Sequence, residues 1–137
     1  MTVKKILVVD DEPDTVAYLT AILEDNDYTV CSAHNAEQAM ELLDTELPDL
    51  MLVDVMMPGA SGLNLIRQVR THPKYGDLPV IVVSGKAEVL RDGFQSYLDR
   101  LNVKHPDGIA EKPFDPASLL EMVDGLLEGL TNPHIPK

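Results

Sequence analysis

The sequence contains no tryptophan, a single cysteine and few aromatic residues, which make up 4% of the chain. A disulfide needs two cysteines, so Cys31 cannot form one within the chain, and this pattern suits a reducing compartment. Because it lies in the apolar stretch YTVCSA, Cys31 is interpreted as a small core residue and not as a reactive thiol. The sequence also lacks a signal-peptide pattern and an apolar run long enough to cross a membrane, so we expect a cytoplasmic protein.

Basic residues are scarce, since 11 lysines and arginines stand against 23 aspartates and glutamates, for a net charge of −12. A chain this acidic is repelled by the phosphates of nucleic acid and by anionic membrane surfaces, which argues against both as partners. Cationic protein surfaces and bound cations remain open.

The length of 137 residues and a hydrophobic content of 45% fit one domain with one packed core. We expect a single domain over 1–137, with its core at about 4–130 and a frayed tail at 131–137.

Short apolar segments alternate with segments of helical periodicity along the whole chain. Strands are predicted at 4–10, 28–33, 49–54, 78–84 and 108–112, and helices at 14–25, 35–45, 63–72, 87–101 and from Asp115 onward. The last helix has Pro116 at its first position, and its predicted buried face consists of Leu119, Val123, Leu126 and Leu130. This alternation predicts an α/β fold with three layers, in which helices cover both faces of a doubly wound, five-stranded parallel sheet.

Four of the predicted strands end in polar or charged side chains. These residues are Asp10 with Asp11, Asp54, Ser84 and Lys112. In a doubly wound sheet the carboxyl ends of the strands share one edge, where ligands bind. Each residue alone could simply mark where its strand leaves the core, but the coincidence of all four favours a common site.

A cluster of carboxylates has a specific electrostatic requirement. Two unit charges about 4 Å apart repel by roughly 4 kcal/mol at an effective dielectric constant near 20, so three acids together favour a cation between them. Oxygen ligands suit Mg²⁺, which also binds phosphate oxygens. A carboxylate beside the metal can attack phosphorus and form an aspartyl phosphate. A nearby lysine and hydroxyl can then contact the phosphate oxygens.

Four motifs carry a family resemblance. The stretches VVDDEP (8–13), DVMMPGASG (54–62), VVSGKA (82–87) and EKPF (111–114) resemble the receiver domain of two-component response regulators. The resemblance covers essentially residues 4–130, and each motif stands at the end of a predicted strand. It implies a CheY-like, flavodoxin-like fold with strand order 2-1-3-4-5.

The resemblance also implies roles for the residues at the strand ends. Asp54 would accept the phosphoryl group. Mg²⁺ would be bound by Asp10, Asp11, Asp54 and the backbone carbonyl of Met56. Ser84 would be the switch hydroxyl, and Lys112 would contact the phosphate. The Met56 side chain should overhang the site. Because methionine cannot hydrogen-bond an attacking water, we expect slow hydrolysis of the aspartyl phosphate.

The sequence departs from the family at two places. Members usually carry tyrosine or phenylalanine three residues before the lysine, whereas this chain has Ile109, which puts the aromatic part of the switch in doubt. The segment 85–108 is about half a dozen residues longer than is usual, and we expect an unusual partner surface or an altered dimer contact there.

The resemblance implies a stand-alone receiver, monomeric or weakly dimeric, that is not an enzyme acting on other molecules. It would take its phosphoryl group from a histidine kinase or a histidine phosphotransfer protein and signal to a downstream protein target. A phosphorylation-independent adaptor with the same fold is the alternative. An aspartyl-phosphate phosphatase is disfavoured, because such sites resemble DxDx[TV] and Met56 occupies the place of the second acid.

Overall fold

The computed structural model describes residues 3–54, 61–84, 96, 99–100, 102, 104–111 and 115–131. The side chains of residues 61, 84 and 129–131 are not included in that description. Among the helices in this part of the chain, none is both long and apolar enough to span a membrane.

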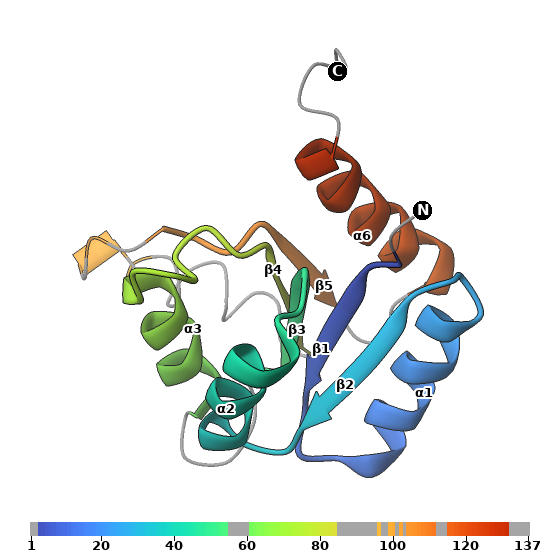
Figure 1. The fold of residues 1–137 in the computed structure, drawn as a ribbon, viewed down its shortest axis with the longest axis horizontal. Coiled ribbons are helices and arrows are strands. Elements are labelled where there is room, and N and C mark those ends of the chain that lie inside the picture. The colour runs from blue at the N-terminus through green and yellow to red at the C-terminus, as the bar shows by residue number, and fades with distance from the viewer. Residues whose placement is uncertain are drawn as a thin grey trace.

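Five parallel strands form one sheet in the order β2-β1-β3-β4-β5 (Figure 1). The strands are β1 (Lys5–Val9), β2 (Thr29–Ala33), β3 (Leu50–Asp54), β4 (Val80–Ser84) and β5 (Gly108–Glu111). Both the predicted fold class and the predicted strand order are confirmed. Parallel pairing of β1 with β3 sets Val9 opposite Val53, so these two central strands reach the same edge together.

Four helices are described in full along the backbone: α1 (Pro13–Glu24), α2 (Ala36–Glu46), α3 (Ser61–Thr71) and α6 (Pro116–Thr131). The start of α2 is capped by Asn35, whose side chain accepts a hydrogen bond from the backbone N–H of Gln38 at 2.8 Å. Its end is marked by Leu47, which takes a left-handed conformation with φ of 49°. The helix predicted at 87–101 falls mostly outside the described residues.

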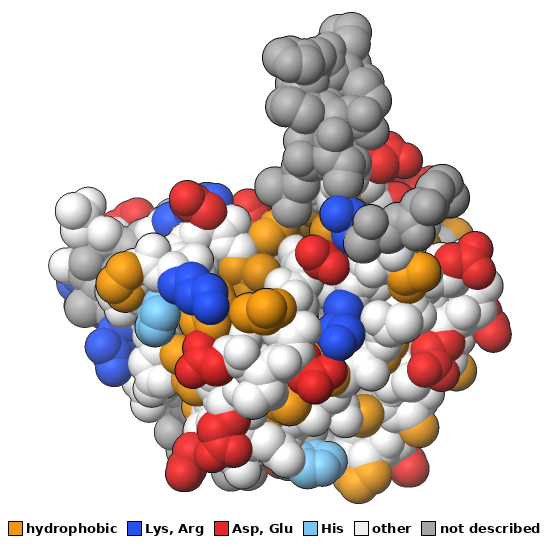
Figure 2. Space-filling model, in the orientation of Figure 1, with side chains coloured by type: hydrophobic (Ala, Val, Ile, Leu, Met, Phe, Trp, Pro, Cys, Tyr) orange, Lys and Arg blue, Asp and Glu red, His pale blue; other side chains and the backbone are white. Residues whose placement is uncertain are grey.

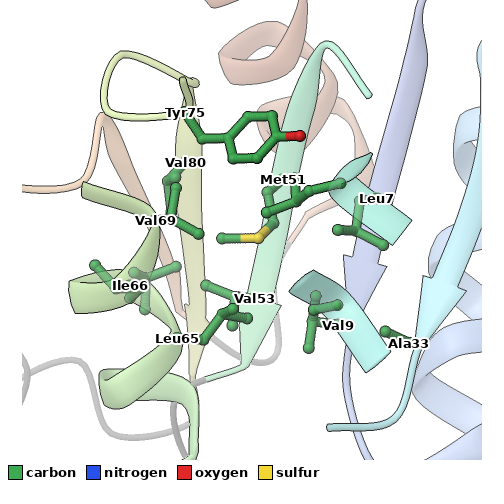
Figure 3. Packing of buried hydrophobic residues seen from close by; sticks show 13 residues of the cluster. Leu7, Val9, Ala33, Met51, Val53, Leu65, Ile66, Val69, Tyr75 and Val80 are labelled. Carbon is green, nitrogen blue, oxygen red and sulfur yellow. The ribbon is translucent and has the colours of Figure 1, made fainter. Parts of the chain in front are cut away.

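The helices cover both faces of the sheet, and acidic side chains spread over the face seen in Figure 2. One hydrophobic cluster lies between the sheet and α2 and α3 (Figure 3), and a second lies between the sheet and α1 and α6. Along β1, Leu7 joins the first cluster, while Ile6 and Val8 join the second. This alternation follows from the two-residue period of a strand and produces the three predicted layers.

The buried face of α6 differs in part from the predicted one. Leu119, Val123 and Leu127 are buried, whereas Leu126 is half-buried at the margin of the same cluster. The spacing of four residues keeps these three side chains on one stripe of the helix, and Leu126 packs beside it, so the prediction missed Leu127 but placed Leu126 on the packed face. The side chain of Leu130 lies outside the described residues.

Cys31 lies on the edge strand β2, half-buried and packed against the first cluster. Its Sγ is 3.9 Å from the carbonyl oxygen of Ile6. Burial raises the pKa of the Cys31 thiol, which favours the unreactive protonated form. These observations agree with its interpretation as a packing residue.

A buried arginine connects segments at the amino edge of the sheet, opposite the edge where the candidate site lies. The Arg70 side chain is 0% exposed. Its guanidinium donates four hydrogen bonds of 2.6–3.2 Å, to the carbonyl oxygens of Gly76, Leu78 and His105 and to the carboxylate of Asp107. This network joins the end of α3 to the segment that leads into β5.

Asp107 extends the same network to the start of β4. Its carboxylate accepts a hydrogen bond from the backbone N–H of Val80 at 2.9 Å. Its own backbone N–H donates to the Val80 carbonyl at 2.8 Å. Asp107 therefore aligns β5 beside β4, and the Arg70–Asp107 ion pair of 2.9 Å ties that alignment to α3. Nothing in the sequence pattern indicated this contact.

Candidate functional site

Three of the predicted site residues meet at the carboxyl edge of the sheet. Asp54 is the last residue of β3, and Asp10 and Asp11 directly follow β1. One carboxylate oxygen from each lies within 4.8 Å of those of the other two. Because β1 and β3 are parallel neighbours in register, the two acidic strand ends come together although 44 residues separate them in the sequence.

Local geometry explains how each buried acid is held. The backbone N–H of Asp10 donates to the Ala33 carbonyl at 3.1 Å, which ties this residue to β2 beyond the end of β1. The Asp10 carboxylate accepts from the backbone N–H of Glu12 at 2.9 Å and so shapes the turn into α1. Asp54 is the last residue of a strand whose five residues are all buried. The sheet therefore positions the backbone of both acids, and the turn before α1 holds the Asp10 carboxylate.

The three acids differ in their exposure. Asp10 is 1% exposed and Asp54 is 5% exposed, whereas Asp11 lies on the surface. Two unit charges at about 4.8 Å repel by roughly 3 kcal/mol at an effective dielectric constant near 20. An all-oxygen cluster with a buried floor and an exposed rim fits a hard cation that keeps part of its water, and this describes Mg²⁺. The residues present therefore fit the metal predicted from the sequence.

The structure describes the other predicted site residues only in part. The backbone of Ser84 ends β4 in register with Glu111 of β5, at the same edge of the sheet as the acids. The side chain of Ser84, and both Met56 and Lys112, lie outside the described residues, so their predicted roles stay predictions. Ile109 is half-buried and packs against the cluster beneath α2 and α3.

Together, the doubly wound sheet in this strand order and the acidic cluster at its carboxyl edge define a CheY-like α/β domain. The family model described as "Response regulator receiver domain" matches residues 6–124. The chain belongs to the response regulator receiver domain family of two-component systems.

Relatives and solved structures agree with this family. The chain is 41% identical, over 124 residues, to an uncharacterized 14.6 kDa protein of the sodA1 3' region in Leptolyngbya boryana, with 86% of each chain covered. It is 32% identical to protein PilH of Pseudomonas aeruginosa, with 91% of this chain and 98% of PilH covered. A signal receiver domain of a histidine kinase from Syntrophus aciditrophicus has a TM-score of 0.81 at 29% identity, covering 94% of this chain and 93% of that one.

The crowded acids lead to a prediction about stability. Replacing Asp11 with alanine removes one charge from the cluster, and we expect the melting temperature of the metal-free protein to rise by about 2–6 °C. Mg²⁺ should raise the melting temperature of the unmodified chain, because it binds the folded state, and should do so much less for the variant. Calorimetry at neutral pH, with and without Mg²⁺, measures both effects.

The matched control is Asp77→Ala, which removes an exposed carboxylate from the turn before β4, at the other edge of the sheet. This variant should respond to Mg²⁺ as the unmodified chain does. A lower melting temperature for metal-free Asp11→Ala would contradict electrostatic strain in the cluster.

Proposed function

We propose that Asp54 accepts a phosphoryl group from a phosphohistidine of a histidine kinase or a histidine phosphotransfer protein. An oxygen of the Asp54 carboxylate attacks phosphorus and forms a P–O bond, while the P–N bond to the donor imidazole breaks and the nitrogen keeps the electron pair. Asp10 and Asp11, with Asp54 and the backbone carbonyl of Met56, would hold Mg²⁺. The bound metal would neutralise charge on the phosphoryl oxygens.

One observation carries the proposal: the oxygens of Asp10, Asp11 and Asp54 lie within 4.8 Å of one another at the carboxyl edge of a receiver fold. The burial of Asp54 supports its role as acceptor, since a carboxylate fixed by a strand loses little freedom on reaction. Ser84 and Lys112 are proposed to contact the phosphate from the ends of β4 and β5.

We propose further that this receiver domain works in the cytoplasm and is monomeric or weakly dimeric. Phosphorylation adds a charge of about −1.5 to −2, which can shift a loop between two arrangements and alter affinity for a downstream protein target. The net charge of −12 disfavours nucleic acid and membranes as targets.

The adaptor alternative has one supporting observation, the apolar packing of Ile109 where the family usually carries an aromatic ring. Acetyl phosphate, or beryllofluoride, with Mg²⁺ separates the two functions. Phosphorylation by acetyl phosphate, seen by intact mass, and binding of beryllofluoride, seen by ¹⁹F NMR, support the phosphoacceptor function. No uptake with either reagent favours the adaptor.

The proposed position of Met56 leads to a prediction about phosphate lifetime. Because asparagine can hydrogen-bond an attacking water and methionine cannot, Met56→Asn is expected to accelerate loss of the phosphoryl group by about tenfold. The rate is measured by intact mass after removal of the phosphodonor. The control is Met40→Asn on α2, which should leave the rate unchanged, and an unchanged rate in Met56→Asn would remove this role.

A further inference from the structure

The charges of this protein are divided unevenly along the sequence. No lysine or arginine occurs between Lys5 and Arg67, while the same stretch contains thirteen aspartates and glutamates. This stretch forms α1, β2, α2 and β3 and includes the three acids of the candidate site. The ten other acids of the stretch are not part of that three-residue cluster.

Part of this excess lines a groove between α2 and α3, which lie beside each other in the fold (Figure 1). The groove has a volume of about 460 Å³ and is lined by Glu37, Met40, Glu41, Asp44 and Gln68. On α2 these residues follow the spacing i, i+3, i+4 and i+7, so they form one stripe along the helix. Gln68 faces them from α3. We call this set of five residues the α2–α3 groove.

The floor of the groove is apolar and one of its walls is fixed. Met40 is half-buried and packs against the cluster beneath α2, which leaves part of its side chain facing the groove. Asp44 accepts a hydrogen bond from the hydroxyl of Tyr75, a side chain that is only 7% exposed. This hydrogen bond raises the pKa of Tyr75, as expected for a hydroxyl that donates to a carboxylate. The groove is therefore a formed feature of the surface.

The carboxylates of the groove have no basic partner within the described residues. Glu37 and Glu41 are four residues apart, a spacing at which like charges destabilise a helix by about 0.2–0.5 kcal/mol. Among the described residues, no lysine or arginine forms an ion pair with Glu37, Glu41 or Asp44. Elsewhere on the same helix, Glu46 pairs with Lys5 at 2.9 Å. A cationic partner would thus relieve repulsion that no described lysine or arginine compensates.

We propose that the α2–α3 groove binds a basic amphipathic segment of a partner protein. An apolar side chain of that segment would rest on Met40, and lysine or arginine side chains on either side would pair with Glu37, Glu41 and Asp44. Apolar contact supplies affinity, and the flanking charges supply orientation and a fast association rate. The proposal does not depend on phosphorylation of Asp54, because none of the five groove residues belongs to the acidic cluster.

Charge also decides against other occupants. Nucleic acid and anionic lipid would face the same three carboxylates and be repelled. A second copy of this chain would have to present one of its few basic segments to the groove. That case is an outcome of the experiment described below.

The test uses a fluorescent helical peptide of about 14 residues built from lysine and leucine, and a second peptide of the same length and pattern with glutamate in place of lysine. Fluorescence anisotropy measures affinity at low and at physiological salt, and amide NMR shifts locate the site. The lysine peptide is expected to bind and to shift the amides of the α2–α3 groove, whereas the glutamate peptide should not bind. The expected affinity falls with salt.

Two variants and a matched control make the test specific. The double reversal Glu37→Lys with Glu41→Lys should weaken binding by about tenfold, and Gln68→Glu, which adds a carboxylate at an exposed position, should strengthen it by about threefold. The control reverses Glu24 and Asp25 at the end of α1, which changes net charge equally. Circular dichroism verifies that all variants fold.

Three outcomes would overturn the proposal. The first is no binding of the lysine peptide. The second is an equal loss of affinity in the groove variant and in the control, which would show general attraction to an acidic surface. The third is a dimer of the unmodified chain, seen by sedimentation velocity, that the Glu37 and Glu41 reversal dissociates, which would assign the groove to a second copy.

Discussion

Asp54→Asn is expected to abolish phosphorylation by acetyl phosphate in the presence of Mg²⁺. The amide has nearly the shape of the carboxylate but lacks the charged oxygen that attacks phosphorus. The substitution also removes one of the three acids proposed to hold the metal. The effect should therefore be a complete loss of the phosphorylated species by intact mass. Since Asp54 lies within 4.8 Å of two other acids, we expect the variant to fold and to melt no lower than the unmodified chain.

The control is Asp27→Asn, which makes the same chemical change at an exposed position. Asp27 has φ of 70°, a left-handed conformation that asparagine also tolerates, so this control should keep both its stability and its phosphorylation. Persistent modification of Asp54→Asn would show that another side chain is the acceptor. Such a result would not contradict the proposed binding of a basic segment at the α2–α3 groove, because the test of that binding does not involve phosphate.

Arg70→Met is expected to lower the free energy of unfolding by about 3 kcal/mol, the largest stability change that we predict. Methionine fills a similar volume, but it leaves the carbonyl oxygens of Gly76, Leu78 and His105 without their donor and leaves Asp107 without its buried cation. Removing one partner of a buried ion pair costs about 3–5 kcal/mol, and the 19% exposure of the Asp107 side chain places this case at the lower end. Urea denaturation measures the change.

Lys104→Met provides the comparison for this prediction. Lys104 also contacts the Asp107 carboxylate, at 3.7 Å, but its side chain is 50% exposed. An exposed pair of this kind contributes at most about 1 kcal/mol, so this variant should be nearly as stable as the unmodified chain. Equal destabilisation by the two substitutions would mean that burial of Arg70 does not set its contribution.

The carboxylate cluster could be predicted because each acid follows an apolar strand. In a parallel sheet the ends of such strands must share an edge, and the spacing of Asp10 and Asp54 from their strands is visible in the sequence. The same reasoning placed Ser84 at this edge. It could not locate Arg70, because a helix residue that binds carbonyl oxygens in a distant turn leaves no periodic signal. It also missed Leu127, because the helical period alone does not decide which of two neighbouring leucines is buried more deeply.

The sequence by itself determined the alternation of strands and helices and the meeting of the acids, because apolar periodicity and strand-end residues act through local rules of backbone geometry. The family and the order of the strands in the sheet were inferred from the resemblance of four sequence motifs. Only the tertiary structure decided which side chains of α6 are buried, that Arg70 joins α3 to β5, and that Glu37, Met40 and Glu41 form a groove with α3. Those features depend on the packing of segments far apart in the chain, and packing is decided by three-dimensional fit that no local pattern encodes.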